Sequence, residues 1–132
     1  MNNLISMKKI SKSFSNNKKI SVLKKINYSF AKGKTYSLMG PSGSGKSTLL
    51  NILSMIDKPS SGSLLINNEV INFSDNINND KIRSKKIGII YQQNNLLPDF
   101  TALENVYFAD LAINNNKKSA IEKARKVIKK MG

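Results

Sequence analysis

The pattern of apolar and polar residues predicts a β-rich beginning to the chain. Residues 3–14 and 22–30 have the composition of two strands, and the polar segment 15–19 between them predicts a turn. A second turn is expected at 31–34, where Gly33 supplies the flexible position. The chain therefore opens with two strands joined by a turn, and a new element follows them.

An apolar run followed by an amphipathic run comes next. Residues 35–39 predict a short buried strand that ends at Gly40. Residues 46–56 have helical spacing. Four apolar positions share one face of this predicted helix: Leu49, Leu50, Leu53 and Ile56. The segment 57–62, which contains proline and glycine, ends the helix.

The middle of the chain is less regular. Residues 63–67 and 69–73 predict a small pair of strands. The polar residues 74–86 are loop-like, with room for one helical turn. Residues 87–91 are a second apolar run and predict another buried strand. An irregular loop is expected over 92–100.

Helical periodicity dominates the last third. Residues 101–113 predict a helix with apolar positions at Leu103, Val106, Tyr107 and Leu111. Residues 119–131 predict another, opened by a capping box between Ser119 and Glu122. Its apolar stripe consists of Ile121, Ala124, Val127, Ile128 and Met131. Strand, glycine-rich loop, helix and later buried strand, in this order, are typical of an α/β nucleotide-binding domain.

Length and composition limit the possible functions. A chain of 132 residues has room for one modest domain or for part of a larger one. No apolar run approaches the roughly 18 residues of a membrane span, and the first residues lack the pattern of a secretory signal. The absence of cysteine and histidine excludes disulfides, thiolate zinc sites and a histidine base, and is consistent with the cytoplasm.

The net charge of +14 raises the question of nucleic-acid binding. Nearly all the basic residues are lysines, and the exceptions are Arg83 and Arg125. Bidentate recognition of bases and phosphates favours arginine, and the lysines are spread along the chain. We interpret the charge as a solvated surface and expect no specific nucleic-acid partner. A non-catalytic, basic nucleotide- or nucleic-acid-binding module is kept as an alternative.

The most informative motif is the glycine-rich segment 40–48. The residues that satisfy G-x-x-x-x-G-K-[ST] are Gly40, Gly45, Lys46 and Ser47. Glycines at this spacing let several backbone N–H groups point at one phosphate, and the following helix adds its positive N-terminal end. We expect Lys46 to reach the β- and γ-phosphates, Ser47 to offer its hydroxyl to Mg²⁺, and Thr48 to add a phosphate contact.

Several segments together resemble one family. The segments 22–40, 40–53, 57–71 and 87–106 are similar, in order and spacing, to ATP-binding cassette (ABC) transporter ATPases. Within that family, 96–106 resembles the ATPase subunits of lipoprotein-releasing transporters and their macrolide-exporter relatives. The resemblance implies an α/β phosphate-loop NTPase fold, with a RecA-like core and an N-terminal antiparallel β-subdomain.

The resemblance also implies roles for individual residues. Phe14 stands where the family places an aromatic residue that stacks on adenine, with a strand-end core residue as the alternative. Gln92 matches the glutamine that reaches Mg²⁺ and the attacking water, with Gln93 as the alternative register. The surface from Leu96 to Val106 matches the docking site of the membrane-spanning subunit. The implied nucleotide-binding residues are Phe14, Gly40, Pro41, Ser42, Gly43, Ser44, Gly45, Lys46, Ser47 and Thr48.

The implied function is that of an ATP-binding subunit that energises an ABC transporter for lipoprotein export. It implies ATP and Mg²⁺ as cofactors, a second ATPase subunit as a partner, and a peripheral place on the cytoplasmic side of the inner membrane. The implied division is β-subdomain strands in 1–35, phosphate loop, core and glutamine loop in 36–100, and the start of a helical subdomain in 101–132. A membrane-surface role for the basic closing helix is the less favoured interpretation.

Three motifs that the family places further along do not occur in this sequence: the signature loop, the Asp-Glu pair and the switch histidine. We expect a domain truncated before the signature motif, which binds Mg-ATP weakly and hydrolyses it negligibly, because phosphoryl transfer depends on positioned charges. Two buried strands without their inner neighbours also predict poor solubility or partial order. The alternative enzyme is a small phosphate-loop kinase with Asp110 as a metal ligand, which the helical spacing around Asp110 disfavours.

Overall fold

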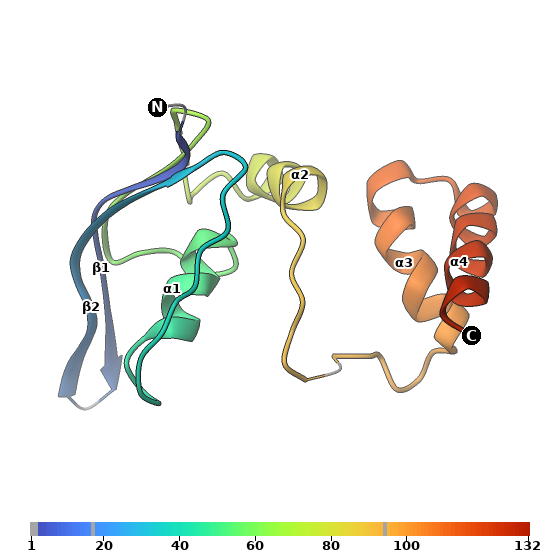
Figure 1. Cartoon of the computed structure of the whole chain (residues 1–132), viewed down its shortest axis with the longest axis horizontal. Coiled ribbons are helices and arrows are strands. Elements are labelled where there is room, and N and C mark those ends of the chain that lie inside the picture. The colour runs from blue at the N-terminus through green and yellow to red at the C-terminus, as the bar shows by residue number, and fades with distance from the viewer. Residues whose placement is uncertain (1–2, 17, 94) are drawn as a thin grey trace. The chain divides into compact units, whose positions relative to one another are not determined.

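An antiparallel sheet forms the first part of the computed structural model, which describes residues 3–16, 18–93 and 95–132 (Figure 1). Its strands are β1 (Asn3–Asn16), β2 (Lys18–Ala31), β3 (Ser61–Ile66) and β4 (Glu69–Val70), in the order β2-β1-β3-β4. The predicted strands 3–14, 22–30 and 63–67 are confirmed, whereas the strand predicted over 69–73 is limited to β4 and is wrong for residues 71–73. β1 and β2 extend into the predicted turn at 15–19, of which Asn17 lies outside the described residues.

The sheet is irregular around Lys9 of β1 and Lys25 of β2. Lys9 and Lys25 have left-handed backbones, with φ of 51° and 47°, where the pairing of β1 with β2 shifts register. On the other side of β1, Gly62 has φ of 90° and lies so close to Lys9 that an added Cβ atom would overlap the Lys9 carbonyl. Only glycine allows this approach. Bulges of this kind increase the local twist of a sheet.

Helix α1 (Lys46–Leu53) contributes Leu49 and Ile52 to the core of this part of the chain. The buried apolar residues here are Met7, Ile10, Leu23, Leu49, Ile52, Met55, Leu64, Leu65, Ile66 and Ile71. The predicted helix face is therefore right at Leu49 but wrong at Leu50 and Ile56, which are 53% and 46% exposed. The helix ends at Leu53 and the chain then turns at Met55, which has φ of 60°, so Met55 rather than Ile56 points inward.

The two predicted buried strands, 35–39 and 87–91, are not strands in the structure. Both segments are coil, and their apolar side chains other than the half-buried Ile87 are exposed, with Met39 at 85% and Ile90 at 100%. A strand needs neighbours that accept and donate its backbone hydrogen bonds. Among the described residues, no strand pairs with either segment. The prediction of buried strands from the apolar composition of these two segments is therefore wrong.

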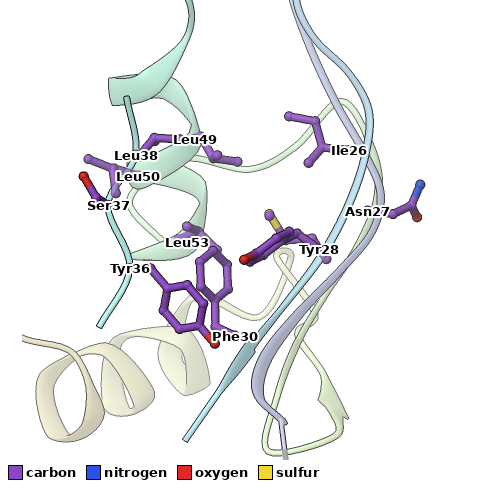
Figure 2. A pocket seen from close by; sticks show the side chains of 11 residues that line it. Ile26, Asn27, Tyr28, Phe30, Tyr36, Ser37, Leu38, Leu49, Leu50 and Leu53 are labelled. Atoms are coloured by element: carbon purple, nitrogen blue, oxygen red, sulfur yellow. The ribbon is translucent and has the colours of Figure 1, made fainter. Parts of the chain in front are cut away.

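The coil that follows β2 borders an apolar hollow of about 410 Å³ (Figure 2). Its lining includes Tyr28, Phe30, Tyr36 and Leu50, from β2, the coil and α1. The rings of Phe30 and Tyr36 meet edge to face, with their centroids 4.9 Å apart. The backbone N–H of Ala31 donates to the Tyr36 hydroxyl at 2.8 Å. These contacts tie the coil to the end of β2.

The chain divides into two compact units, 1–79 and 80–132, and each is described by itself. Helix α2 (Asn76–Lys86) crosses the boundary, and it is a full helix where one turn was expected. The second unit contains α3 (Ala102–Asn114) and α4 (Lys117–Met131). Its buried cluster consists of Tyr107, Ala120 and Ala124, packed against Leu103, Phe108, Leu111 and Ile121. Within the described ranges, no helix combines the length and apolarity needed to cross a membrane.

Both helices of the second unit are confirmed, but their caps and faces differ in part from the prediction. The capping box lies at the start of α3, between Thr101 and Glu104. α4 begins two residues before the predicted start, and its N-cap Asn116 accepts from the Ser119 N–H at 3.1 Å, so the Ser119 capping box is wrong. The expected apolar stripe of α4 holds at Ala124. It is wrong at its end, since Val127 and Met131 are 50% and 86% exposed.

Candidate functional site

The glycine-rich segment 40–45 leads directly into the N-terminus of α1. Gly45 is the N-cap residue, with φ of 91°, and the N–H of Leu49 donates to its carbonyl at 2.9 Å. A Cβ atom on Gly45 would lie 2.9 Å from Val22 Cγ1 and 3.0 Å from Leu23 Cδ2. This glycine therefore lets the loop and the first turn of the helix lie directly against β2.

The N-terminus of α1 keeps its backbone donors free of side-chain partners. Among the described residues, no side chain caps this helix and no acidic residue lies in its first turn. The first N–H groups of a helix have no partner within the helix and carry the positive end of its dipole. Such an end is a site for a phosphate or another anion. The loop residues 40–44 and Ser47 are exposed, so an anion can reach it.

Lys46 folds back over the beginning of the loop. Its Nζ donates to the carbonyl of Gly40 at 2.8 Å and to the carbonyl of Pro41 at 2.7 Å. The loop also holds itself together through the Ser44 N–H, which donates to the Pro41 carbonyl at 3.3 Å. The ammonium therefore lies at the loop and is bound to neutral carbonyl oxygens. It can exchange these partners for a more strongly attracting phosphate oxygen.

Phe14 lies on β1 near the end of the strand and is 45% exposed, which fits a platform better than a core position. Two residues before it, Lys12 pairs in register with Leu23, the residue whose side chain touches the Gly45 position. The sheet thus places Phe14 about 7 Å along the strand from the level of the loop. The Lys12 ammonium lies 5.0 Å from the Phe14 ring centroid, so the two side chains are neighbours on the same face of the strand.

Gln92 and Gln93 belong to the second unit and lie in the irregular segment before α3. Both side chains are exposed. The segment is coil, as expected for 92–100, with Asn94 outside the described residues. The role of Gln92 toward Mg²⁺ and water, with Gln93 as the alternative, stays a prediction.

The segment from Leu96 to Val106 presents apolar side chains on a well-bonded turn. Leu96, Leu97 and Phe100 are 63%, 49% and 44% exposed. Asn105 holds the turn: its Oδ1 accepts from the Leu97 N–H at 2.8 Å, and its Nδ2 donates to the Phe100 carbonyl at 3.0 Å. The sequence pattern did not single out Asn105, because an asparagine inside a predicted helix gives no sign of its partners upstream.

Thr101 and Glu104 form the cap that follows this turn. The Thr101 hydroxyl donates to Glu104 Oε2 at 2.7 Å, and the Thr101 N–H donates to the same oxygen at 2.8 Å. The hydroxyl hydrogen bond first, and the backbone hydrogen bond second, lower the pKa of the Glu104 carboxyl from its ordinary value of 4.5. The ionised carboxylate is therefore part of the cap.

Asp110 lies in the middle of α3 and is engaged by neighbouring helical side chains. Lys123 Nζ donates to Asp110 Oδ1 at 2.9 Å, and Asn114 Nδ2 donates to the same oxygen at 2.8 Å. A metal-binding Asp of a phosphate-loop enzyme would instead follow an apolar strand. The helical position confirms the expectation from the residue spacing and leaves the kinase alternative without support.

The sheet, the glycine-rich loop and α1 define a phosphate-loop fold of the ATP-binding cassette type. The chain belongs to the ABC transporter family, whose model matches residues 23–132. One relative, the lipoprotein-releasing system ATP-binding protein LolD of Rickettsia bellii, is 41% identical in an alignment that covers 99% of this chain and 58% of that protein. The uncharacterized ABC transporter ATP-binding protein MJ0796 of Methanocaldococcus jannaschii is 45% identical over 104 residues, or 78% of this chain and 44% of that protein.

Solved structures support the same fold. A dimeric, post-hydrolysis structure of the ATP-binding cassette MJ0796 bound to ADP and Pi has a TM-score of 0.83 and 37% identity, and covers 95% of this chain and 56% of that chain. CbiO1 from Clostridium perfringens, part of the transporter complex cbiONQ, has a TM-score of 0.72 at 24% identity and supports the fold alone. The chain thus spans about half the length of these proteins, with 58% of the Rickettsia relative and 56% of the MJ0796 structure covered.

Proposed function

We propose that the chain supplies the nucleotide-binding part of an ATP-binding subunit that energises an ABC transporter. The observation that carries this proposal is the exposed glycine-rich loop at an uncapped helix N-terminus, with the Lys46 ammonium bound to the Gly40 and Pro41 carbonyls. The backbone donors and the lysine together suit the β- and γ-phosphates of ATP. The family match and the ADP-bound MJ0796 cassette support the same ligand class.

Mg²⁺ is the second proposed cofactor. Among the described residues, no group of three or more His, Cys, Asp or Glu side chains could hold a metal ion. Proteins often bind Mg²⁺ through one or two side chains together with substrate phosphates and waters. Ser47 would offer its hydroxyl beside the phosphates, and Gln92 would reach the ion and the attacking water. When bound, the ion neutralises charge that develops on the phosphate oxygens.

Lipoprotein release is the transport process that we propose. The support is the similarity to the lipoprotein-releasing system protein LolD of Rickettsia bellii, which covers 99% of this chain. The exposed surface from Leu96 to Val106 is the proposed contact with membrane-spanning subunits, because exposed apolar side chains on a hydrogen-bonded turn suit a protein interface. A second ATPase subunit is the other proposed partner, supported by the dimeric MJ0796 structures. The proposed location is the cytoplasmic face of the inner membrane.

Hydrolysis by the 132-residue chain alone is expected to be negligible. The sequence has no histidine, and the signature loop and Asp-Glu pair of the family do not occur in it. Because catalysis of phosphoryl transfer is mostly positioning and charge stabilisation, a site without these groups loses most of its rate. We therefore propose that residues 1–132, assayed by themselves, bind Mg-ATP without appreciable turnover.

Calorimetric titration with Mg-ATP tests the proposed site. Lys46→Ala should weaken binding about 10- to 100-fold, the effect of losing a hydrogen bond between charged groups. Lys34→Ala, which changes an exposed lysine in the turn after β2, is the matched control and should leave the affinity unchanged. Unchanged binding in Lys46→Ala, or turnover at a typical transporter rate that this substitution abolishes, would contradict the proposal. DNA binding that depends steeply on salt and is unchanged by Lys46→Ala would favour the alternative of a basic nucleic-acid-binding module.

A further inference from the structure

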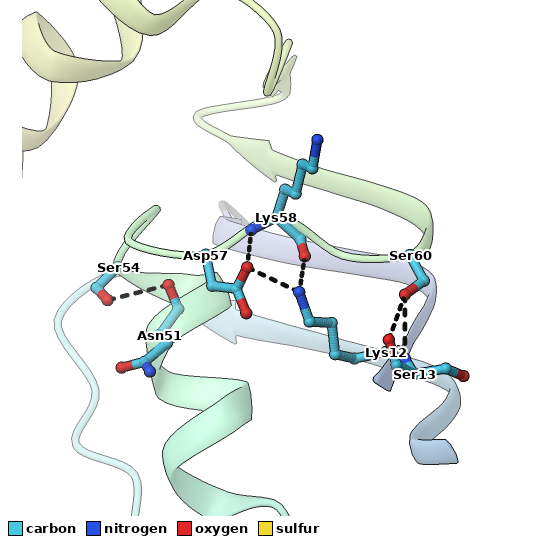
Figure 3. Close-up of polar contacts among 7 residues, drawn as sticks. All are labelled: Lys12, Ser13, Asn51, Ser54, Asp57, Lys58 and Ser60. Carbon is cyan, nitrogen blue, oxygen red and sulfur yellow. Dashed lines mark hydrogen bonds and ion pairs between the residues drawn. The ribbon is translucent and has the colours of Figure 1, made fainter. Parts of the chain in front are cut away.

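A buried lysine lies next to Phe14, the residue expected to stack on adenine; Phe14 is called the base platform below. Lys12 on β1 is 8% exposed, and its ammonium donates to Asp57 Oδ1 at 2.7 Å and to the Lys58 carbonyl at 2.8 Å (Figure 3). The same ammonium lies 5.0 Å from the centroid of the Phe14 ring, over the ring. A buried ammonium needs such partners because its desolvation is costly. The three contacts hold Lys12 in one place.

Asp57 is itself held by the end of α1. Its backbone N–H donates to the carbonyl of Asn51 at 3.1 Å. The segment that follows Asp57 is bonded to β1, where Ser60 Oγ accepts from the Ser13 N–H at 3.0 Å (Figure 3). Lys12 therefore connects the proposed base platform to the C-terminal end of the helix whose N-terminus carries the phosphate loop.

We propose that Lys12, anchored by Asp57, is a positioning residue for the nucleotide base. The ammonium covers one face of the Phe14 ring and holds the ring so that its other face is presented to the base. A cation is attracted to the negative face of an aromatic ring, and Phe14 remains 45% exposed for a stacking partner. This inference rests on the proposed nucleotide-binding function and on the adenine-stacking role that the family resemblance implies for Phe14.

The anchoring also separates Lys12 from the phosphate-binding lysine. Lys46 is bound to two neutral carbonyl oxygens of its own loop. Lys12 instead donates to a carboxylate and is buried, so turning it toward a phosphate would leave the Asp57 carboxylate without its cation. Lys12 therefore affects the affinity for the base and leaves the affinity for the triphosphate unchanged.

Comparison of ATP with tripolyphosphate, which lacks base and ribose, tests this separation on the full chain. Lys12→Met should weaken ATP binding about three- to tenfold, as expected for a lost cation–π support, and change tripolyphosphate binding less than about twofold. Lys12→Arg keeps a cation that can lie over the ring and should restore most of the ATP affinity. Lys8→Met, an exposed position on β1, is the control and should change neither affinity.

A second variant distinguishes a folding defect from a specific loss of base binding. Lys12→Met alone removes the cation beside Asp57, whereas Lys12→Met with Asp57→Asn removes both charges together. Circular dichroism establishes which variants are folded at the temperature of the titration. The folded double variant should show the same selective loss of ATP affinity. Full ATP affinity in the double variant would overturn the proposal.

The Phe14→Leu variant links the lysine to the ring. It should weaken ATP binding about tenfold through lost base stacking, and Lys12→Met added to it should cause no further loss, because the two residues act as a unit. Equal weakening of ATP and tripolyphosphate by Lys12→Met, additive losses, or no effect of Phe14→Leu would each overturn the inference while leaving the phosphate site intact. Failure of the proposed function is distinct, since Lys46→Ala would then leave both ligands unaffected.

Discussion

At the scale of single residues, Gly45 determines how closely the phosphate loop approaches the sheet. Two separate features exclude a side chain there. The backbone φ of 91° lies in the left-handed region, which disfavours residues with a Cβ atom. An added Cβ atom would also lie only 2.9 Å from Val22 Cγ1 and 3.0 Å from Leu23 Cδ2, which is closer than van der Waals contact. The requirement for glycine is thus both conformational and steric.

Gly45→Ala should therefore lower the free energy of unfolding by about 2–3 kcal/mol, from backbone strain plus overpacking. Gly33→Ala is the matched control, because Gly33 has φ of 74° but no atom lies within 4 Å of its added Cβ. The control should lose only about 1 kcal/mol, from strain alone. Urea unfolding measures both. Equal losses would show that the contact with β2 contributes nothing.

At the scale of elements, the start of α3 is fixed by reciprocal hydrogen bonds between Thr101 and Glu104. The N–H of Glu104 donates to Thr101 Oγ1 at 3.2 Å, and the Glu104 carboxylate accepts from the Thr101 N–H at 2.8 Å. The carboxylate also lies at the positive end of the helix dipole. This cap joins the helix to the exposed turn that we propose as the contact with a membrane-spanning subunit.

The cap predicts a pH dependence. Because the pKa of Glu104 is lowered in the folded chain, its contribution to stability is complete above the ordinary value of 4.5 and is lost as the pH falls through the lower folded value. Helix content followed by circular dichroism should therefore decrease in that acidic range, and Glu104→Gln should reduce the decrease. Glu122→Gln, which changes an exposed glutamate of α4 outside the cap, is the control. The same change of profile in both variants would contradict this role of the cap.

Local patterns predicted most elements because their signals are local. The strands of the sheet and helices α1, α3 and α4 follow from turn residues and apolar periodicity. Helix α2 gave no such signal, and its buried residue is Asn79, whose amide donates to the Asn72 carbonyl at 2.9 Å. The predicted strands at 35–39 and 87–91 failed for the opposite reason. Apolar composition indicates a preference for burial, but pairing depends on neighbours elsewhere in the chain.

The residues of the candidate site also divide into those that the sequence predicts and those that only the fold brings together. The phosphate loop was predictable because its spacing, its glycines and its helix are consecutive in the sequence. Lys12 was not predictable, because its partner Asp57 is 45 residues away and only the fold brings them together. Asn105 was missed for a similar reason. A family resemblance can point to Phe14, but only the register of β1 with β2 relates it to the loop.

At the scale of the whole molecule, each unit exposes apolar side chains that its own core does not cover. In the first unit, Tyr36, Leu38 and Met39 are 41%, 45% and 85% exposed. In the second, Ile90 and Leu96 are 100% and 63% exposed. Exposed apolar groups of this kind promote association between chains. We therefore expect association between chains through these exposed residues, rather than a low free energy of unfolding of the small cores, to limit the solubility of the chain.

Substitution of the exposed residues separates association from stability. Met39→Ser combined with Ile90→Ser should reduce association in sedimentation experiments and binding of an apolar dye, yet change the free energy of unfolding by less than about 0.5 kcal/mol per site. Ile52→Ala is the buried control, fully inaccessible in the core of the first unit, and should lower the free energy of unfolding by about 2–5 kcal/mol.

If the serine variant were destabilised as much as Ile52→Ala, Met39 and Ile90 would be buried in solution. The coil conformation of 35–39 and 87–91 would then be wrong. If the serine variant kept its stability and lost its association, the exposed segments 35–39 and 87–91 would be confirmed as sites of contact between chains.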